Sequence, residues 1–210
     1  MKSGGKPLKK SRVYNTIELT AVLFALWFVM SQKTEPKFLI IGAAASTVIA
    51  LLCMRTLCMK GAKTDTLYYF TEPSFYRMLV YLGWLIVQII KSAVYVSGIS
   101  LSDRSKVDPS VAYFKADYDS PFARALLANS ITLTPGTITI DISDEGYYSV
   151  HALTRELREG LLDGSMQKKV AWAYGEEIDF RPLDEKEIAV IDVIEHETSP
   201  RSFRVRRRKK

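Results

Sequence analysis

The chain changes character near residue 103, with long apolar runs before this position and alternating or amphipathic patterns after it. Between Arg12 and Asp103 there are only eleven charged residues, and they leave uncharged runs at 19–32, 38–54 and 78–90. A helix needs about 20 mostly apolar residues, and at least about 17, to cross a bilayer. The second run is long enough, and the first becomes so with its flanking residues. Because only a short connection separates them, these two runs predict a transmembrane helical hairpin.

The third run, 78–90, continues after Lys91 as a second apolar segment. It fits a third span whose Lys91 side chain reaches toward the lipid headgroups, or a helix lying in the membrane interface. Positive charge favours the second alternative, because the N-terminus and the segment 55–77 are basic and basic segments prefer the cytoplasmic side. Two spans plus an interfacial helix keep every basic segment inside, whereas three spans would place residues 103–210 outside.

After residue 103 the pattern is typical of a domain in contact with water. Residues 111–118 are rich in β-branched and aromatic side chains, which predicts a strand. Asp119, Ser120 and Pro121 are typical of a helix start, where an N-cap side chain is followed by proline in the first turn. A helix is therefore expected over the apolar residues that follow.

A β-hairpin is predicted in the centre of this domain. Residues 134–136, with the sequence Thr-Pro-Gly, predict a tight turn in which the glycine takes a positive φ. Residues 137–142 alternate strictly, which places Ile138, Ile140 and Ile142 on one face of a strand. After a second turn, residues 147–152 form the returning strand.

Two short helices, at 154–162 and 166–174, and a last strand at 188–194 complete the prediction. The expected fold class is α+β: an N-terminal transmembrane helical hairpin, a third transmembrane or interfacial helix, and a small β-α-β-β-α cytoplasmic domain. The expected division is a basic N-terminal segment at 1–15, membrane helices at 16–101, the α+β domain at 103–180, and an acidic then basic tail at 181–210 that we expect to be disordered.

The formal net charge of +6 conceals a strong separation of charge. Residues 1–12 carry +5 and residues 201–210 carry +7, which leaves −6 on residues 13–200. On a membrane-bound chain, anionic lipid headgroups attract basic residues by about 1 kcal/mol each. We therefore expect both basic ends to bind anionic membrane lipids rather than nucleic acid, with a merely solubilising tail as the alternative.

Known catalytic motifs are absent from the sequence, which has no Walker loop, no G-x-S-x-G, no H-E-x-x-H and no C-x-x-C pair. His151 has no second histidine or cysteine near it, and a metal site needs several ligands. Cys53 and Cys58 are too few for a disulfide scaffold and lie in an apolar run. We expect no catalytic residue, no bound metal, no cofactor and no enzymatic activity.

Residues 126–141, LLANSITLTPGTITID, are followed by Val150, His151 and Ala152, with His151 ten positions after Asp141. This combination resembles the signature of the E subunits of multisubunit (Mrp/Mnh-type) Na+/H+ antiporters, and the resemblance covers roughly residues 14–175. An A-L-W sequence in the first apolar run fits as well. The chain departs from the family at Gln88, where members often carry a carboxylate. The motif residues, which we interpret as structural, are Asn129, Ser130, Thr132, Thr134, Pro135, Gly136, Thr137 and His151.

Local chemistry agrees with a structural role for these residues. Threonines beside a turn favour strand, and their hydroxyls can cap the preceding helix. Asn129 and Ser130 are expected to be C-terminal caps of that helix. His151 is expected to be packed or hydrogen-bonded rather than catalytic.

The resemblance implies an accessory integral-membrane subunit of a monovalent cation (Na+)/proton antiporter in the cytoplasmic membrane, with the other subunits as partners. Small residues at 42–46 would allow close approach to neighbouring membrane helices. Two alternatives stay open: an accessory subunit of a membrane-bound hydrogenase or respiratory complex with antiporter-like modules, and a free-standing membrane-anchored binding module.

Overall fold

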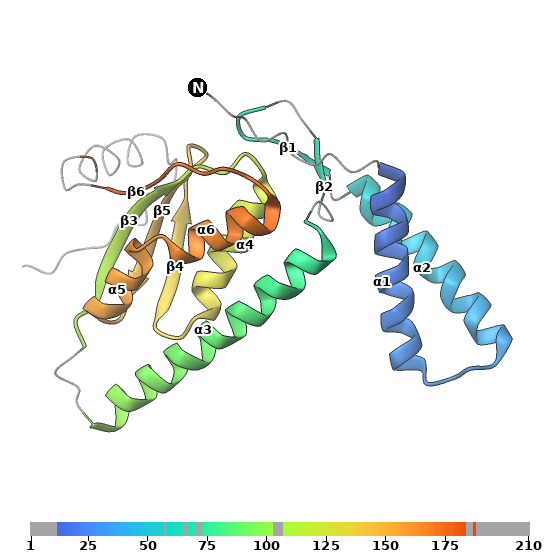
Figure 1. Cartoon of the computed structure of the whole chain (residues 1–210), viewed down its shortest axis with the longest axis horizontal. Coiled ribbons are helices and arrows are strands. Elements are labelled where there is room, and N and C mark those ends of the chain that lie inside the picture. Colours follow the sequence, from blue (N-terminus) through green and yellow to red (C-terminus); the bar gives the residue numbers. More distant parts are fainter. Residues whose placement is uncertain are drawn as a thin grey trace, which may run out of the picture.

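The computed structural model describes residues 12–56, 58–64, 67–69, 73–102, 107–183 and 187. A helical hairpin, a small two-stranded sheet and a long third helix precede an α+β domain (Figure 1). The elements are, in chain order, α1 (Arg12–Ser31), α2 (Pro36–Thr56), β1 (Cys58–Lys60), β2 (Leu67–Tyr69), α3 (Phe75–Ser102), β3 (Ser110–Ala116), α4 (Pro121–Leu133), β4 (Thr137–Ile142), β5 (Tyr147–Ala152), α5 (Arg155–Leu162), α6 (Ser165–Tyr174) and β6 (Phe180–Pro182).

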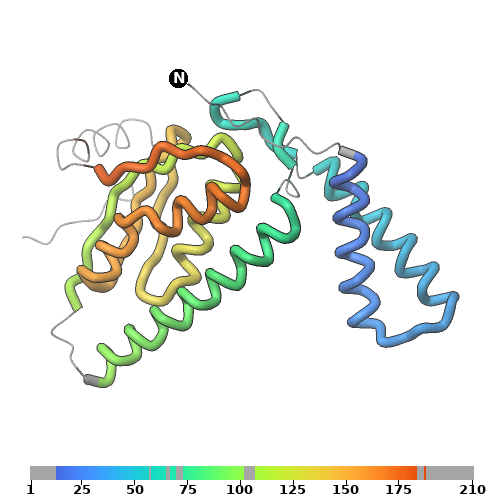
Figure 2. Tube along the Cα trace, viewed as in Figure 1, coloured from blue at the N-terminus to red at the C-terminus, as the bar shows by residue number. Residues whose placement is uncertain are grey.

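The predicted hairpin is formed by α1 and α2, which pack against each other (Figure 2). The buried residues of α2 recur every four positions, at Gly42, Ser46, Ala50 and Met54. A Cβ atom at Gly42 would lie 2.4 Å from Cε3 of Trp27, so only glycine fits beneath this indole. Gly42 therefore allows close packing of α2 on α1 within the hairpin, and the expectation that it contacts neighbouring subunits is wrong. Residues 43–45 remain exposed.

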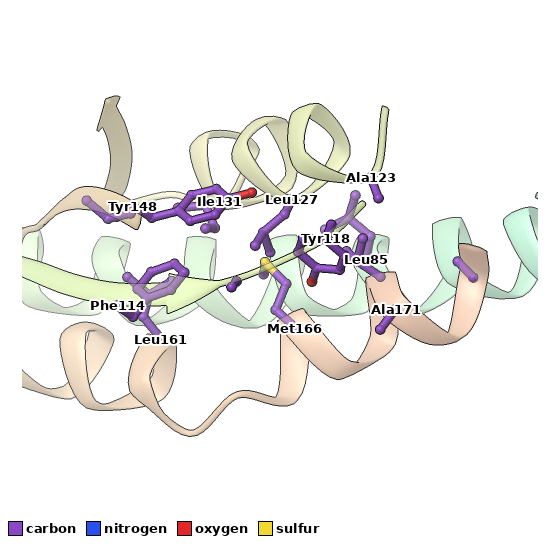
Figure 3. Close-up of a cluster of buried hydrophobic side chains, with 14 of the residues drawn as sticks. Leu85, Phe114, Tyr118, Ala123, Leu127, Ile131, Tyr148, Leu161, Met166 and Ala171 are labelled. Carbon is purple, nitrogen blue, oxygen red and sulfur yellow. The ribbon is translucent and has the colours of Figure 1, made fainter. Parts of the chain in front are cut away.

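Helix α3 is one uninterrupted helix of 28 residues that passes through Lys91. One side faces the α+β domain, where Tyr81 and Leu85 belong to the hydrophobic core. Figure 3 shows Leu85 among the core side chains of the domain. The opposite side is apolar and exposed, as at Ile86 (56% exposed) and Ile90 (57%). Together with α1 and α2, α3 is long and apolar enough to cross a membrane.

The domain contains a four-stranded antiparallel sheet in the order β4-β5-β3-β6. Alternate residues of the central strands, including Phe114, Tyr148 and Val150, are buried. The helices α4 and α6 join this core, and α3 packs against them from outside (Figure 1). The rings of Phe114 and Tyr148 are stacked with centroids 5.1 Å apart, and Figure 3 shows them at one end of the buried cluster.

The predicted β-hairpin is confirmed, but its isoleucines do not share one face. A register shift between Thr139 and Asp141 interrupts the alternation of β4. Ile138 and Ile140 are exposed, whereas Ile142 packs against the core. A β-bulge of this kind, which adds one residue to one strand, turns the later side chains to the other face.

The structure adds elements that the hydrophobic pattern does not predict, namely the short strands β1, β2 and β6. The helix start at Ser120 and Pro121 is confirmed, since Ser120 accepts a hydrogen bond from the Ala123 N–H. The two helices after the hairpin are confirmed as α5 and α6. The strand expected at 188–194 lies outside the described residues.

Candidate functional site

The motif of residues 129–137 forms the junction between α4 and β4. The helix continues to Leu133 and its C-cap is Thr134, so the expectation that Asn129 and Ser130 are C-terminal caps is wrong. Both lie in the last turns of the helix, where Ser130 is buried and Asn129 is exposed. The apolar residues after Ser130 allow α4 one further turn before Pro135 ends it, because proline disfavours helical backbone in the residue before it.

Threonine hydroxyls join the two elements of this junction. Thr134 Oγ1 donates to the Ser130 carbonyl at 2.9 Å, and the buried Thr137 Oγ1 donates to the Ile131 carbonyl at 2.6 Å. Thr139 Oγ1 donates to the Ala128 carbonyl at 3.1 Å. Ser130 and Ile131 belong to the last turn of α4, whose carbonyl groups lack intrahelical partners, whereas Ala128 lies earlier in the helix. The threonines are thus occupied by backbone carbonyls.

The same junction is bonded to α3. Tyr81 and Ser130 share a buried hydrogen bond of 2.5 Å, and Ser130 donates to the Leu126 carbonyl at 2.7 Å. Because a serine has one hydroxyl proton, Tyr81 is the donor of this pair. Further along α3, Ser92 donates to the Pro135 carbonyl at 2.6 Å. The motif therefore fixes the domain against the length of α3.

Gly136 lies where this turn passes between two helices. Its φ of +88° belongs to the region that favours glycine, as the sequence predicts for the turn. A Cβ atom here would be 2.6 Å from Leu157 Cδ1 of α5 and 3.1 Å from Val96 Cγ2 of α3. Both the backbone conformation and the available space therefore call for glycine.

A cavity of about 260 Å³ lies beside the motif, between α3, the turn, α5 and α6. Its lining combines apolar groups with the side chains of Gln88, Lys91, Thr134 and Glu156. The hydroxyl of Thr134 is already engaged with a carbonyl oxygen. Gln88 and Lys91 line this cavity, which places them at the domain rather than on the apolar outer side of α3.

His151 is half-buried in the central strand β5, opposite Val111 on one side and Ile138 on the other. It shares no cluster with other metal-ligating side chains: the described residues contain no group of three or more His, Cys, Asp or Glu that could hold a metal. The structure thus places His151 within the sheet, on the strand that pairs with the start of β4 beside the α4–β4 junction.

A second polar cluster, which no local sequence pattern predicts, joins the membrane hairpin to the domain. The carboxylate of Asp119 accepts hydrogen bonds from the backbone N–H groups of Lys63 and Thr64, at 2.7 and 3.1 Å, and from the side chains of Thr64 and Tyr68. The Ala62 N–H donates to the Asp119 carbonyl at 2.9 Å. The β1–β2 segment, which follows α2, is thereby held on the start of α4.

Two further carboxylates complete this cluster. Glu176 accepts from the N–H groups of Asp119 and Ser120, at 3.0 and 3.1 Å. Asp117 lies 2.9 Å from Lys63 Nζ and 3.4 Å from Arg124. The cluster therefore connects the segment after α2, the start of α4 and the end of α6 through charged hydrogen bonds, which are stronger than neutral ones.

The pKa values of Asp119 and Glu176, the two acidic groups at the centre of the cluster, are shifted in opposite directions. Burial alone would raise the pKa of Asp119, but hydrogen bonds from Thr64, Tyr68 and the Lys63 backbone outweigh it and lower the pKa. Burial raises the pKa of Glu176, and the bonds from Asp119 and Ser120 oppose that rise only in part. The cluster therefore has a structural role: each carboxylate accepts hydrogen bonds from backbone or side-chain donors and so holds the connected elements together.

Comparison with known sequences finds Na+/H+ antiporter subunits, both among family models and among individual proteins. The model of the family MNHE, described as Na+/H+ ion antiporter subunit, matches residues 20–171. The chain is 26% identical over 164 residues to the E1 subunit of the Na+/H+ antiporter of Staphylococcus haemolyticus, covering 77% of this chain and 98% of that protein. It is 24% identical over 156 residues to the Na+/H+ antiporter subunit E1 from Staphylococcus aureus (strain bovine RF122 / ET3-1), and this match covers 72% of this chain and 92% of that protein.

Comparison with solved structures identifies a similar fold in the membrane-bound sulfane sulfur reductase, an archaeal respiratory membrane complex. The TM-score is 0.50 at 24% sequence identity, over 65% of this chain and 81% of the matched chain. At this identity the similarity concerns the fold alone.

Proposed function

The chain belongs to the MNHE family of Na+/H+ ion antiporter subunits, and from this membership we propose that it is an accessory membrane subunit that supports assembly and stability of the antiporter complex. The observation that carries the proposal is the scarcity of ionisable side chains along its membrane helices. Ion pathways use ionisable residues inside the membrane, usually paired. In α1, α2 and α3 only Glu18 and Lys91 lie more than one turn from a helix end.

The two exceptions do not form a path. Glu18 belongs to α1, whereas Lys91 lines the cavity beside the α4–β4 junction. Transport chemistry is therefore assigned to the other subunits of the complex. The hydrogen-bonded motif and the Asp119 cluster support the accessory role, because both hold the domain to the membrane helices.

Neighbouring subunits are expected to contact the exposed side of the hairpin. In α2 the residues 43–45 are small and exposed, which permits close approach of a second helix. Replacing Ala45 with leucine is expected to reduce recovery of the complex after detergent extraction. Unchanged recovery would remove this face from the interface.

For the topology, we infer that α1 and α2 cross the membrane and that α3 lies in its cytoplasmic interface. Hydrogen bonds made by Tyr81, Ser92 and Tyr95 hold α3 along the domain. The bond of Tyr95 is with the Thr154 hydroxyl, at 3.3 Å. If α3 crossed the bilayer in this arrangement, the domain and its charged surface would enter the hydrocarbon. A helix parallel to the membrane instead presents its exposed apolar side to lipid while the domain stays in water. The proposed division is 16–101 at the membrane and 103–180 in the cytoplasm.

Cysteine labelling tests this topology in a chain whose native Cys53 and Cys58 are replaced by alanine. Lys33→Cys, in the α1–α2 turn, is expected to react with a membrane-impermeant maleimide in intact cells. Glu159→Cys, exposed on α5, is expected to react only after permeabilisation. Reaction of Glu159→Cys in intact cells would contradict the cytoplasmic placement and support three spans.

The basic ends, at 1–12 and 201–210, would face the same anionic leaflet in this topology. We propose that they bind its lipids rather than nucleic acid. Replacing the basic residues of 201–210 with glutamine is expected to weaken binding of the purified chain to anionic but not to neutral vesicles. Equal binding to both would leave a solubilising tail as the explanation.

Deletion of the gene provides the functional test. We expect loss of growth in sodium at alkaline pH and a fall in the assembled large subunits on native gels, both restored by the wild-type chain. Intact assembly with lost transport would contradict the accessory role and favour direct participation in transport.

A second candidate is an accessory subunit of a respiratory complex with antiporter-like modules. The similarity in fold to a chain of an archaeal respiratory complex favours it. In that case deletion is expected to abolish a respiratory activity and leave sodium tolerance unchanged. A free-standing binding module would leave both unchanged.

A further inference from the structure

A larger cavity, of about 430 Å³, lies between the membrane hairpin and the domain. Its walls come from four helices, with Leu19 and Val22 on α1, Met78 and Leu82 on α3, Leu126 on α4 and Tyr174 on α6. Its volume lies within the range of roughly 300–1,000 Å³ that is typical of small-molecule sites. Apart from Glu18, Asn129 and Tyr174, the side chains that line it are apolar.

The lining of the cavity excludes most polar ligands. A polar molecule buried against such walls would lose hydrogen bonds to water without replacing them. An apolar cavity stays dry or takes an apolar ligand. The occupant that fits these walls is therefore a flexible hydrocarbon.

The cavity is also continuous with the surface that the chain presents to the bilayer. Val22 and Leu82 line it and are each 42% exposed, so they belong both to its walls and to the outer apolar sides of α1 and α3. A hydrocarbon chain of a membrane lipid can thus enter without crossing water.

The size of the cavity favours a lipid chain over a helix of a neighbouring subunit. A helix with its side chains is about 10–12 Å across and rises 5.4 Å per turn, so the cavity holds roughly one turn. An acyl chain is thin enough to extend through the whole space. It would also add apolar contacts between α1 and the domain across this cavity, where α1 otherwise packs mainly on α2.

We propose that this cavity binds one acyl chain of a phospholipid from the cytoplasmic leaflet, which holds the hairpin against the domain. The choice of leaflet rests on the proposed topology, because the lining residues of α1, at 18–22, and of α3, at 75–82, lie between the N-terminal end and the middle of each helix. The lipid site itself depends only on the cavity and on the membrane location of these helices.

Photo-crosslinking tests the proposal on the full complex in nanodiscs that contain phosphatidylethanolamine with a diazirine in its acyl chain. Bulk lipid labels the outer sides of α1 and α3 in any case, so the informative adducts are those on α4, between residues 121 and 133. We expect α4 adducts in the wild type and a loss on the order of fivefold or more in Ala125→Phe, which fills the cavity. The control Ile90→Phe, on the outer side of α3, is expected to keep them.

Absence of α4 adducts in the wild type, or equal adducts in Ala125→Phe, would overturn the lipid site. A benzophenone amino acid at position 125 that crosslinks to another subunit instead of to lipid would also overturn it. The proposed accessory function is tested separately, by the effect of gene deletion on assembly of the complex. Assembly of the complex with Ala125→Phe, monitored on native gels, separates the two outcomes.

Discussion

Replacement of Gly136 by alanine is expected to destabilise the link between the α4–β4 junction and α3. The φ of +88° is strained for any residue with a Cβ atom, which costs about 1–3 kcal/mol. The added methyl group meets Leu157 Cδ1 at 2.6 Å and Val96 Cγ2 at 3.1 Å. Overpacking costs about 1–3 kcal/mol, and the lower end applies because both contacts are ends of side chains. The expected total is roughly 2–4 kcal/mol.

Gly160→Ala is the matched control. Gly160 lies in α5, and a Cβ atom there would have no heavy atom within 4 Å. Alanine is favoured over glycine in a helix by about 1 kcal/mol, so this variant is expected to be more stable.

The assay heats detergent-solubilised full chain that carries a fluorescent tag and records the temperature at which half of the monodisperse peak is lost. A change of 1 kcal/mol corresponds to about 2–4 °C for a chain of this size, so Gly136→Ala is expected to lower the midpoint by roughly 5–15 °C. Gly160→Ala is expected to raise it slightly. A midpoint for Gly136→Ala equal to that of the wild type would mean that neither the positive φ nor the packing of this turn requires glycine.

Three further variants test other contacts with the same thermal assay. Gly42→Leu is expected to separate α1 from α2 and lower the midpoint strongly, because Trp27 leaves no room for a Cβ atom; Gly83→Leu, with nothing within 4 Å, is expected to have little effect, and equal effects would contradict the packing. Thr137→Val removes a buried donor and is expected to cost about 1–3 kcal/mol, most of which serine at this position should restore. Burial raises the pKa of Glu176 above its ordinary 4.5, so its ionised form is less favoured in the folded than in the unfolded chain. Glu176→Gln is therefore expected to gain stability relative to the wild type as the pH rises from about 4 toward 7, and a difference that does not change with pH would contradict the burial of this carboxyl.

The membrane helices and the order of the domain's main elements could be predicted from the sequence because they follow from local patterns. The uncharged runs locate α1 and α2, and the alternation at 137–142 locates β4. The turn at Gly136 is likewise encoded locally, by a proline and a glycine in the right order. Such signals depend on neighbouring residues alone.

Other features depend on contacts between distant residues and leave no local signal. Asp119 looks like a helix-start residue in the sequence, whereas its carboxylate binds a segment more than 50 positions earlier in the chain. Gly42 looks like a small residue for contact with other subunits, whereas its partner is Trp27 of the same hairpin. Strand β6 is too short to be recognised without its partner β3. Only a comparison of both partners in many related sequences would reveal these pairs.

We propose that this chain works as a subunit within an antiporter complex. Affinity purification of the tagged chain from membranes of its native host, followed by identification of the proteins that accompany it in fixed proportion, tests this claim most directly. The other subunits of a Na+/H+ antiporter are expected to accompany it. Recovery of the 23.7 kDa chain alone, or with the subunits of a respiratory complex, would contradict the proposal.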